Sequence, residues 1–193
     1  MPRLILASTS PYRREILARL GVPFEAVAPV CDETPLAGES AADTANRLAV
    51  LKAQSLVSRF PDALVIGSDQ VALLDGQQLG KPHTVESAHA MLAAMRGRSV
   101  VFHTALCVLN AATGRQQTVV DTTTVTLRPY TDAQISRYLA QEPDALHCAG
   151  AAKSEGLGGA LIARIDSIDP NALIGLPLFA LITLLAQEGV EIL

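Results

Sequence analysis

The sequence predicts an α/β protein built around a mixed β-sheet, and three observations lead to this prediction. Apolar residues make up 49% of the 193 residues and charged residues 18%, so the chain can fill a sizeable core and is not a disordered protein. Short apolar runs typical of buried strands alternate with segments of helical periodicity. Two runs rich in Val and Thr, separated by a turn, add a β-hairpin. We expect a single domain over residues 1–193, either as one body or as two closely joined lobes.

The N-terminal segment is predicted to form a strand, a tight polar turn and a helix. Residues 4–7 are a continuous apolar run. Ser10 followed by Pro11 is typical of an N-cap and a first helical residue, and Gly21 can end the helix. The other elements expected in this half are a strand over 22–28, a helix from Ser40 to near Val57, and strands over 63–66 and 71–74.

The rest of the chain is predicted to contain the hairpin and three more helices. Thr84 can cap a helix that ends at Met95, and Thr131 and Gln134 have the spacing of a capping box for a helix to Gln141. The hairpin strands are expected over 100–109 and 119–127, followed later by a strand over 160–165 and a final apolar helix over 177–187.

Charge and composition argue against several classes of protein. Lys and Arg number 15 against 19 Asp and Glu, a formal net charge of −4, which argues against a broad basic face for nucleic acid. Cys31, Cys107 and Cys148 form no CxxC pair, so neither a disulfide scaffold nor a structural zinc site is expected. The N-terminal apolar run, residues 4–7, is too short for a signal peptide core, and the most apolar stretch, residues 172–186, is interrupted by Gly175 and Pro177 and is too short to span a membrane. We therefore expect a cytoplasmic protein that binds neither nucleic acid nor a membrane.

The turn after the first strand is a candidate phosphate site. Ser8, Ser10, Arg13 and Arg14 lie there beside a predicted helix N-terminus, whose unpaired N–H groups attract anions. An ordinary N-cap followed by two solvated arginines explains the same residues. Spacing alone favours this second interpretation.

A second candidate is Asp69, which the prediction places at the end of the buried strand 63–66. Ligand sites in open α/β sheets gather beyond the carboxyl ends of strands, and a carboxylate there can hold a divalent metal or take a proton from water. A structural Asp in a polar turn is the alternative. Glu33 adds a loop carboxylate, and Lys52 and Lys81 are possible point charges for a phosphate, although each alone is typical of an ordinary surface lysine.

Taken together and in order, these segments resemble the Maf family of nucleotide pyrophosphatases over residues 3–193. The segments that carry the resemblance are 4–14, Asp32-Glu33-Thr34-Pro35, Lys52-Ala53, Ile66-Gly67-Ser68-Asp69-Gln70, Gly80-Lys81-Pro82, Ala149-Gly150, Glu155-Gly156-Leu157-Gly158 and Gly175-Leu176-Pro177-Leu178. The resemblance implies a Maf-like, inosine triphosphatase-like three-layer fold, with an elongated mixed sheet and a nucleotide cleft between two lobes. It implies hydrolysis of a nucleoside triphosphate to the monophosphate and pyrophosphate with a divalent metal, Mg²⁺ or Mn²⁺.

The same resemblance assigns roles to individual residues. Asp69 falls on the family's acid/base aspartate, and Glu33 on its acidic position, so both are candidate metal ligands. The phosphate-binding positions fall on Ser8, Ser10, Arg13, Lys52 and Lys81. The nucleotide is the expected partner, and both a monomer and a homodimer remain open.

Three positions depart from the commonest family pattern, which is Arg, Thr and Gln. This chain has Tyr12, Gln70 and Glu155 there, and this combination resembles the subgroup that acts on 7-methyl-GTP rather than those relatives that act on dTTP and UTP. A carboxylate can accept from both N–H donors of a guanine edge, and methylation at N7 makes the base cationic, so an aromatic ring adds cation–π attraction of about 0.5–2 kcal/mol. The rival predictions are a pyrophosphatase for dTTP, UTP or other modified nucleotides, and a nucleotide-binding regulator of septum formation without relevant turnover.

Overall fold

The computed structural model describes residues 2–193 and confirms the α/β prediction. The chain forms two compact units. Unit 1 comprises residues up to 70 together with 103–121 and 169–193, and unit 2 comprises 71–102 and 122–168. Three long strands, β3 (Ala63–Leu74), β5 (Ser99–Asn110) and β6 (Gln116–Leu127), contribute residues to both units.

Unit 1 contains the parallel part of the sheet. Its strand order is β2-β1-β3-β5-β6. β1 (Arg3–Ala7) pairs in parallel with β2 (Phe24–Val27) on one side and with β3 on the other, so that Leu4 lies opposite both Phe24 and Leu64. Because β1 is buried from Leu4 to Ala7, it is a continuous apolar run rather than an alternating one.

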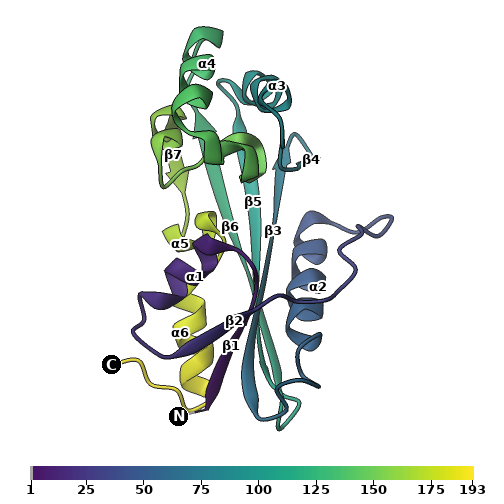
Figure 1. Ribbon diagram of the computed structural model, residues 1–193. Helices are drawn as coiled ribbons and strands as arrows, with labels where there is room; N and C mark the ends of the chain where they lie inside the picture. Colours follow the sequence, from purple (N-terminus) through teal and green to yellow (C-terminus); the bar gives the residue numbers. More distant parts are fainter. Residues whose placement is uncertain (1) are drawn as a thin grey trace. The chain divides into compact units, whose positions relative to one another are not determined.

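The helices of unit 1 cover both faces of its sheet. α2 (Ala41–Gln54) lies on one face, and α1 (Pro11–Ala18) and α6 (Leu178–Gln187) lie on the other (Figure 1). The short α5 (Pro170–Ile174) precedes α6. The core between α1, α6 and the sheet includes Leu6, Ile16, Ile66, Leu106, Leu176 and Leu181, all fully buried.

Unit 2 combines antiparallel strands with two helices. β4 (Gln77–Leu79) pairs with the second half of β3, and β7 (Ile162–Asp166) pairs with the second half of β6. α3 (Val85–Met95) lies beside α4 (Asp132–Gln141), and the segment after α4 forms the 3₁₀ turns Pro143–His147, Ala149–Ala151 and Leu157–Leu161. The buried hydroxyl of Tyr130 donates to the carbonyl of Leu92 at 2.8 Å and so connects the segment between β6 and α4 to α3.

The predicted helix starts are confirmed. Ser10, Ser40, Thr84 and Thr131 each accept a hydrogen bond at the N-cap of α1, α2, α3 and α4, and the box between Thr131 and Gln134 is complete. The hairpin strands are adjacent in the sheet. The helix expected to reach Val57 ends at Gln54, and α5 was not predicted, although Asp169 followed by Pro170 is a recognisable start signal.

One prediction about the sheet is wrong. Residues 63–66 and 71–74 are not separate strands, because β3 continues through Gly67, Ser68, Asp69 and Gln70. The polar side chains do not end the strand since each finds partners: Ser68 donates to the Ala105 carbonyl, and Asp69 pairs with Lys52. Asp69 therefore lies within a strand and not at its end.

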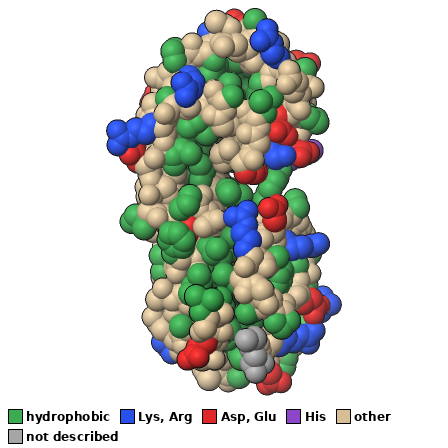
Figure 2. Space-filling model, turned by 90° about the vertical axis from the view of Figure 1, so that its left-hand side faces the viewer, with side chains coloured by type: hydrophobic (Ala, Val, Ile, Leu, Met, Phe, Trp, Pro, Cys, Tyr) green, Lys and Arg blue, Asp and Glu red, His purple; other side chains and the backbone are tan. Residues whose placement is uncertain are grey.

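The surface shows dispersed charges. On the face shown in Figure 2, Lys and Arg side chains are scattered among Asp, Glu and hydrophobic side chains. Of the helices within residues 2–193, none is both long and apolar enough to cross a membrane.

Gly67 is expected to be a sensitive position for stability. A Cβ at Gly67 would lie 2.1 Å from the Ala49 carbonyl oxygen and 2.9 Å from the Ala53 nitrogen, so Gly67→Ala must displace α2 from β3. We expect a loss of about 1–3 kcal/mol in the free energy of unfolding, measured by urea denaturation. Gly80→Ala is the control, because a Cβ there meets open space. Equal stability of both variants contradicts the packing argument.

Candidate active site

A buried lysine forms the centre of a charged cluster in unit 1. Lys52, on α2, is 6% exposed, and Asp69, on β3, is 8% exposed. Lys52 Nζ lies 2.6 Å from Asp69 Oδ1 and 3.0 Å from Glu33 Oε2. The side chain of Glu33 is 56% exposed, so the cluster has one end in solvent. The structure thus brings together three residues that the resemblance had assigned.

Arg13 is the second cation of the cluster. Its Nε donates to the Gly175 carbonyl at 2.7 Å, and the Ser68 hydroxyl donates to the same carbonyl at 2.9 Å. Burial lowers the pKa of the Arg13 guanidinium from its ordinary value, while the negative charges of Asp69 and Glu33 oppose this shift. The guanidinium remains charged at neutral pH because an arginine pKa starts far above that range.

The predicted phosphate-binding hydroxyls lie in the turn before α1. Ser8 is buried, and its Oγ accepts from the Ser10 nitrogen at 3.1 Å. The Ser10 Oγ accepts from the Arg13 nitrogen at 3.4 Å and caps α1. The N-cap is therefore confirmed for Ser10, and Arg14 is exposed, but Arg13, in the first turn of α1, is a partly buried member of the cluster rather than a solvated arginine.

The predicted specificity residues of unit 1 differ in their surroundings. Tyr12 is half-buried at the second position of α1. The Gln70 amide Nε2 donates to Thr104 Oγ1 at 2.9 Å and to the carbonyls of Ala172 and Leu173 at 3.0 Å each. Gln70 therefore holds α5 against the sheet with its amide nitrogen, a role that the sequence prediction missed.

Two predicted residues lie in unit 2. Lys81 is exposed between Gly80 and Pro82. Glu155 is exposed on the segment between two 3₁₀ turns, and its Oε2 accepts from the Ser154 hydroxyl at 3.2 Å.

The carboxylates of the cluster fit a divalent cation that arrives with a triphosphate. Among residues 2–193, no group of three or more His, Cys, Asp and Glu is arranged to hold a metal ion by itself. Mg²⁺ is usually held by one or two carboxylates together with substrate phosphates and water. Asp69 and Glu33 supply two carboxylates, and both lie against Lys52.

Gly175 and Thr104 are site residues to which the sequence assigned no role. The Gly175 carbonyl holds Arg13, and Thr104 accepts from Gln70. Gly175 adopts a φ of 127°, and a Cβ there would lie 3.4 Å from Arg13 Nε. Gly175 could have been found from the sequence, because it begins the family segment Gly175-Leu176-Pro177-Leu178. Thr104 lies in none of the segments that carry the resemblance.

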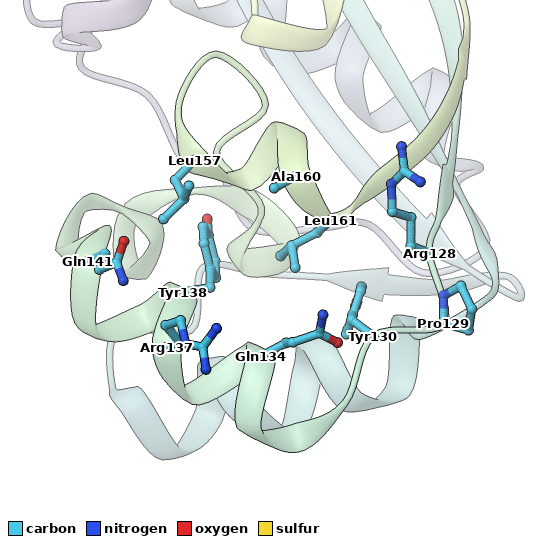
Figure 3. A pocket seen from close by; sticks show the side chains of 10 residues that line it. All are labelled: Arg128, Pro129, Tyr130, Gln134, Arg137, Tyr138, Gln141, Leu157, Ala160 and Leu161. Atoms are coloured by element: carbon cyan, nitrogen blue, oxygen red, sulfur yellow. The ribbon is translucent and has the colours of Figure 1, made fainter.

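Unit 2 also contains a recess of about 390 Å³ against α4. Figure 3 shows Tyr130 and Tyr138 among its lining side chains, with Gln134 and Arg137 from α4 and Leu157 from the opposite segment. None of the predicted site residues, all of which are described, lines this recess.

The sequence of the chain matches the profile of the family described as "Maf-like protein" over residues 3–188. The chain belongs to the Maf-like protein family.

Curated relatives cover the whole length of this Maf-like protein. A "7-methyl-GTP pyrophosphatase" of Chromobacterium violaceum is 64% identical over 98% of both chains. A protein of the same name from Thiobacillus denitrificans is 59% identical over 100% of this chain and 95% of its own length. Among solved structures, the Staphylococcus aureus Ham1 protein matches with a TM-score of 0.46 at 13% identity, covering 66% of this chain and 72% of its own. Family membership therefore rests on the sequence matches.

Removal of Lys52 is expected to destabilise this Maf-like protein more than removal of Asp69. Lys52→Met leaves the buried Asp69 carboxylate without its ammonium, which costs about 3–5 kcal/mol for a buried pair. Asp69→Asn leaves Lys52 in contact with Glu33, so its cost is smaller. Urea unfolding of both variants and of the double variant measures the difference. A Lys52→Met protein as stable as the wild type contradicts the assignment of Lys52 as the counter-ion of Asp69.

Proposed function

We propose that this Maf-like protein hydrolyses 7-methyl-GTP to 7-methyl-GMP and pyrophosphate. The cluster of Lys52, Asp69, Glu33 and Arg13 carries the proposal, because it combines two cations for a polyphosphate with two carboxylates for proton transfer and metal binding. The names of relatives that are 64% and 59% identical support the choice of substrate.

The positive groups bind the triphosphate. Lys52 and Arg13 offset its charge in a largely buried environment, where charge–charge attraction is less screened than in water. The Ser8 and Ser10 hydroxyls add donors in the adjacent turn, and the resemblance assigns a further phosphate-binding role to Lys81.

The reaction is an in-line attack of water on the α-phosphorus. A bond forms between the water oxygen and the α-phosphorus, and the bond from that phosphorus to the α–β bridging oxygen breaks, so pyrophosphate leaves with the electron pair. Asp69 Oδ1 is held by Lys52, and its Oδ2 takes the proton from the attacking water. No covalent intermediate is required, and Ser8 and Ser10 are not nucleophiles.

A divalent cation, Mg²⁺ or Mn²⁺, belongs to the proposed active form. Glu33 would hold it, and Asp69 is the second candidate ligand, in the alternative in which it does not take the proton; the cation would neutralise charge on the phosphate oxygens. Chelation with EDTA should accordingly stop pyrophosphate release, and added Mg²⁺ should restore it.

Recognition of the base is assigned to Glu155 and Tyr12. The exposed Glu155 carboxylate accepts from the N–H donors of guanine, and the Tyr12 ring stacks on the cationic base. Gln70 contributes by holding α5 through its amide nitrogen. We also propose a cytoplasmic location, where nucleotide pools are used, and keep a homodimer as an open alternative to a monomer.

Asp69→Asn is the test of the catalytic assignment. The amide has the size of the carboxylate but cannot take the proton, so kcat is expected to fall by about 10²–10⁴-fold. The measurement is pyrophosphate release from 7-methyl-GTP, GTP, dTTP and UTP with Mg²⁺ or Mn²⁺, with circular dichroism as the folding control. Wild-type preference for dTTP or UTP favours the rival substrate class, and absence of turnover on every substrate favours the nucleotide-binding regulator.

Glu155→Gln is the test of base recognition. The amide turns an N–H toward the guanine donors and removes the negative charge, so the ratio of kcat/KM for 7-methyl-GTP to that for GTP should fall by about tenfold or more. Paired kinetics on the two substrates measure this ratio. An unchanged ratio refutes the role of Glu155.

A further inference from the structure

The segment that carries Glu155 is bound by one carboxylate at both of its ends. Glu142, the residue directly after α4, accepts from Lys153 Nζ with Oε1 at 3.0 Å and from the Leu157 nitrogen with Oε2 at 3.1 Å. Lys153 lies two residues before Glu155 and Leu157 lies two residues after it. Glu142 thus connects α4 to both ends of the segment 153–157.

Both groups that contact Glu142 are donors, and this requires a carboxylate at position 142. The side chains of Glu142 and Lys153 are only 15% and 16% exposed, so their ion pair is better shielded than a surface pair. A glutamine of the same size would direct its NH₂ group toward either Lys153 Nζ or the Leu157 nitrogen. One of the two contacts would then become a repulsion between donors.

Tyr138 holds the same segment through the backbone. Its hydroxyl accepts from the Lys153 nitrogen at 3.0 Å and donates to the Ala151 carbonyl at 3.0 Å. Burial raises the pKa of Tyr138 to about 12, so the hydroxyl keeps the proton that it donates at neutral pH. Figure 3 shows this hydroxyl on the side of Leu157, with the ring lining the recess.

Two glycines allow the segment to lie directly against these groups. A Cβ at Gly156 would lie 2.4 Å from Glu142 Oε2, and a Cβ at Gly158 would lie 2.5 Å from the Lys153 carbonyl oxygen. The Gly156 nitrogen also donates to the Lys153 carbonyl at 3.1 Å, which closes a turn around Glu155. The backbone on each side of Glu155 is therefore held by α4 and by its own turn.

We propose that Glu142 is a positioning residue that fixes the backbone of Glu155 and thereby sets the selectivity for the methylated base. This inference rests on the proposed role of Glu155. An acceptor held in place before the nucleotide binds loses less conformational freedom on binding, and it discriminates better between bases that differ by one charge.

Glu142→Gln tests the proposal through substrate selectivity. We expect the ratio of kcat/KM for 7-methyl-GTP to that for GTP to fall about tenfold, because Glu155 then has to be ordered when the nucleotide binds. The loss should lie in KM for 7-methyl-GTP, with kcat within about twofold of the wild type, because Glu142 touches none of the groups assigned to phosphate chemistry. In a Glu155→Gln background the same substitution should change the ratio by less than about twofold.

Asp144→Asn is the matched control. Asp144 Oδ2 also accepts from Lys153 Nζ, at 2.8 Å, but its side chain is 60% exposed, and the Leu157 nitrogen donates to Glu142. Removal of this exposed ion pair should change the ratio by less than about twofold.

Hydrogen exchange over residues 153–158 measures the positioning independently of any substrate. Glu142→Gln should accelerate exchange there, because the Leu157 N–H loses its acceptor. Unchanged exchange overturns the proposal. If Glu155→Gln lowers the selectivity ratio and Glu142→Gln does not, the positioning role is wrong and the proposed function stands. If Glu155→Gln leaves the ratio unchanged, the base role is wrong and the positioning role is refuted with it.

Tyr138→Phe provides a second variant in case Glu142→Gln does not fold. It removes the hydroxyl that binds the Lys153 nitrogen and leaves the ring in place. The same direction of change in selectivity and in exchange is expected. Faster exchange over residues 153–158 with wild-type selectivity overturns the proposal, because a loosened backbone around Glu155 then has no effect on selectivity.

Discussion

The close packing of α2 against β3 is the constraint on which the charged cluster depends. Gly67 has no side chain, so the backbone of α2 at Ala49 and Ala53 can lie directly on the strand. This contact places Lys52 of α2 next to Asp69, two residues further along β3, at 2.6 Å. A larger residue at position 67 would separate the two charges, and the Asp69 carboxylate would then be buried without its counter-ion.

The carbonyl of Gly175 joins other parts of unit 1 to this cluster. It accepts from Arg13, in the first turn of α1, and from Ser68, in the middle of β3. The Gln70 amide, two residues beyond Ser68, binds carbonyls of α5 just before Gly175. Alternate side chains of β3 therefore hold the C-terminal segment, while Asp69 between them points toward α2. The alternation of a β-strand thus directs successive side chains to two different parts of unit 1.

Overall charge is a poor guide to this kind of site. The chain has a formal net charge of −4, yet it places two cations, Lys52 and Arg13, in one largely buried cluster with the carboxylates of Asp69 and Glu33. Local arrangement, not the sum of charges, determines whether an anionic nucleotide is attracted. In unit 2, too, the local arrangement of charges matters: Glu142 and Lys153 form an ion pair beside the backbone of Glu155.

Local rules were enough to predict much of the fold, because their causes lie within a few residues. Ser10, Ser40, Thr84 and Thr131 cap their helices through their own following turns, and the hairpin is set by its own loop. The ordered motifs were enough to indicate the family. By contrast, only tertiary packing decided that β3 runs on through Asp69, that Lys52 reaches a carboxylate 17 residues away, and that Gln70 uses its amide nitrogen on α5. The physical reason is that each polar group of β3 finds its partner on a segment remote in sequence, so no window of the sequence contains both halves of the interaction.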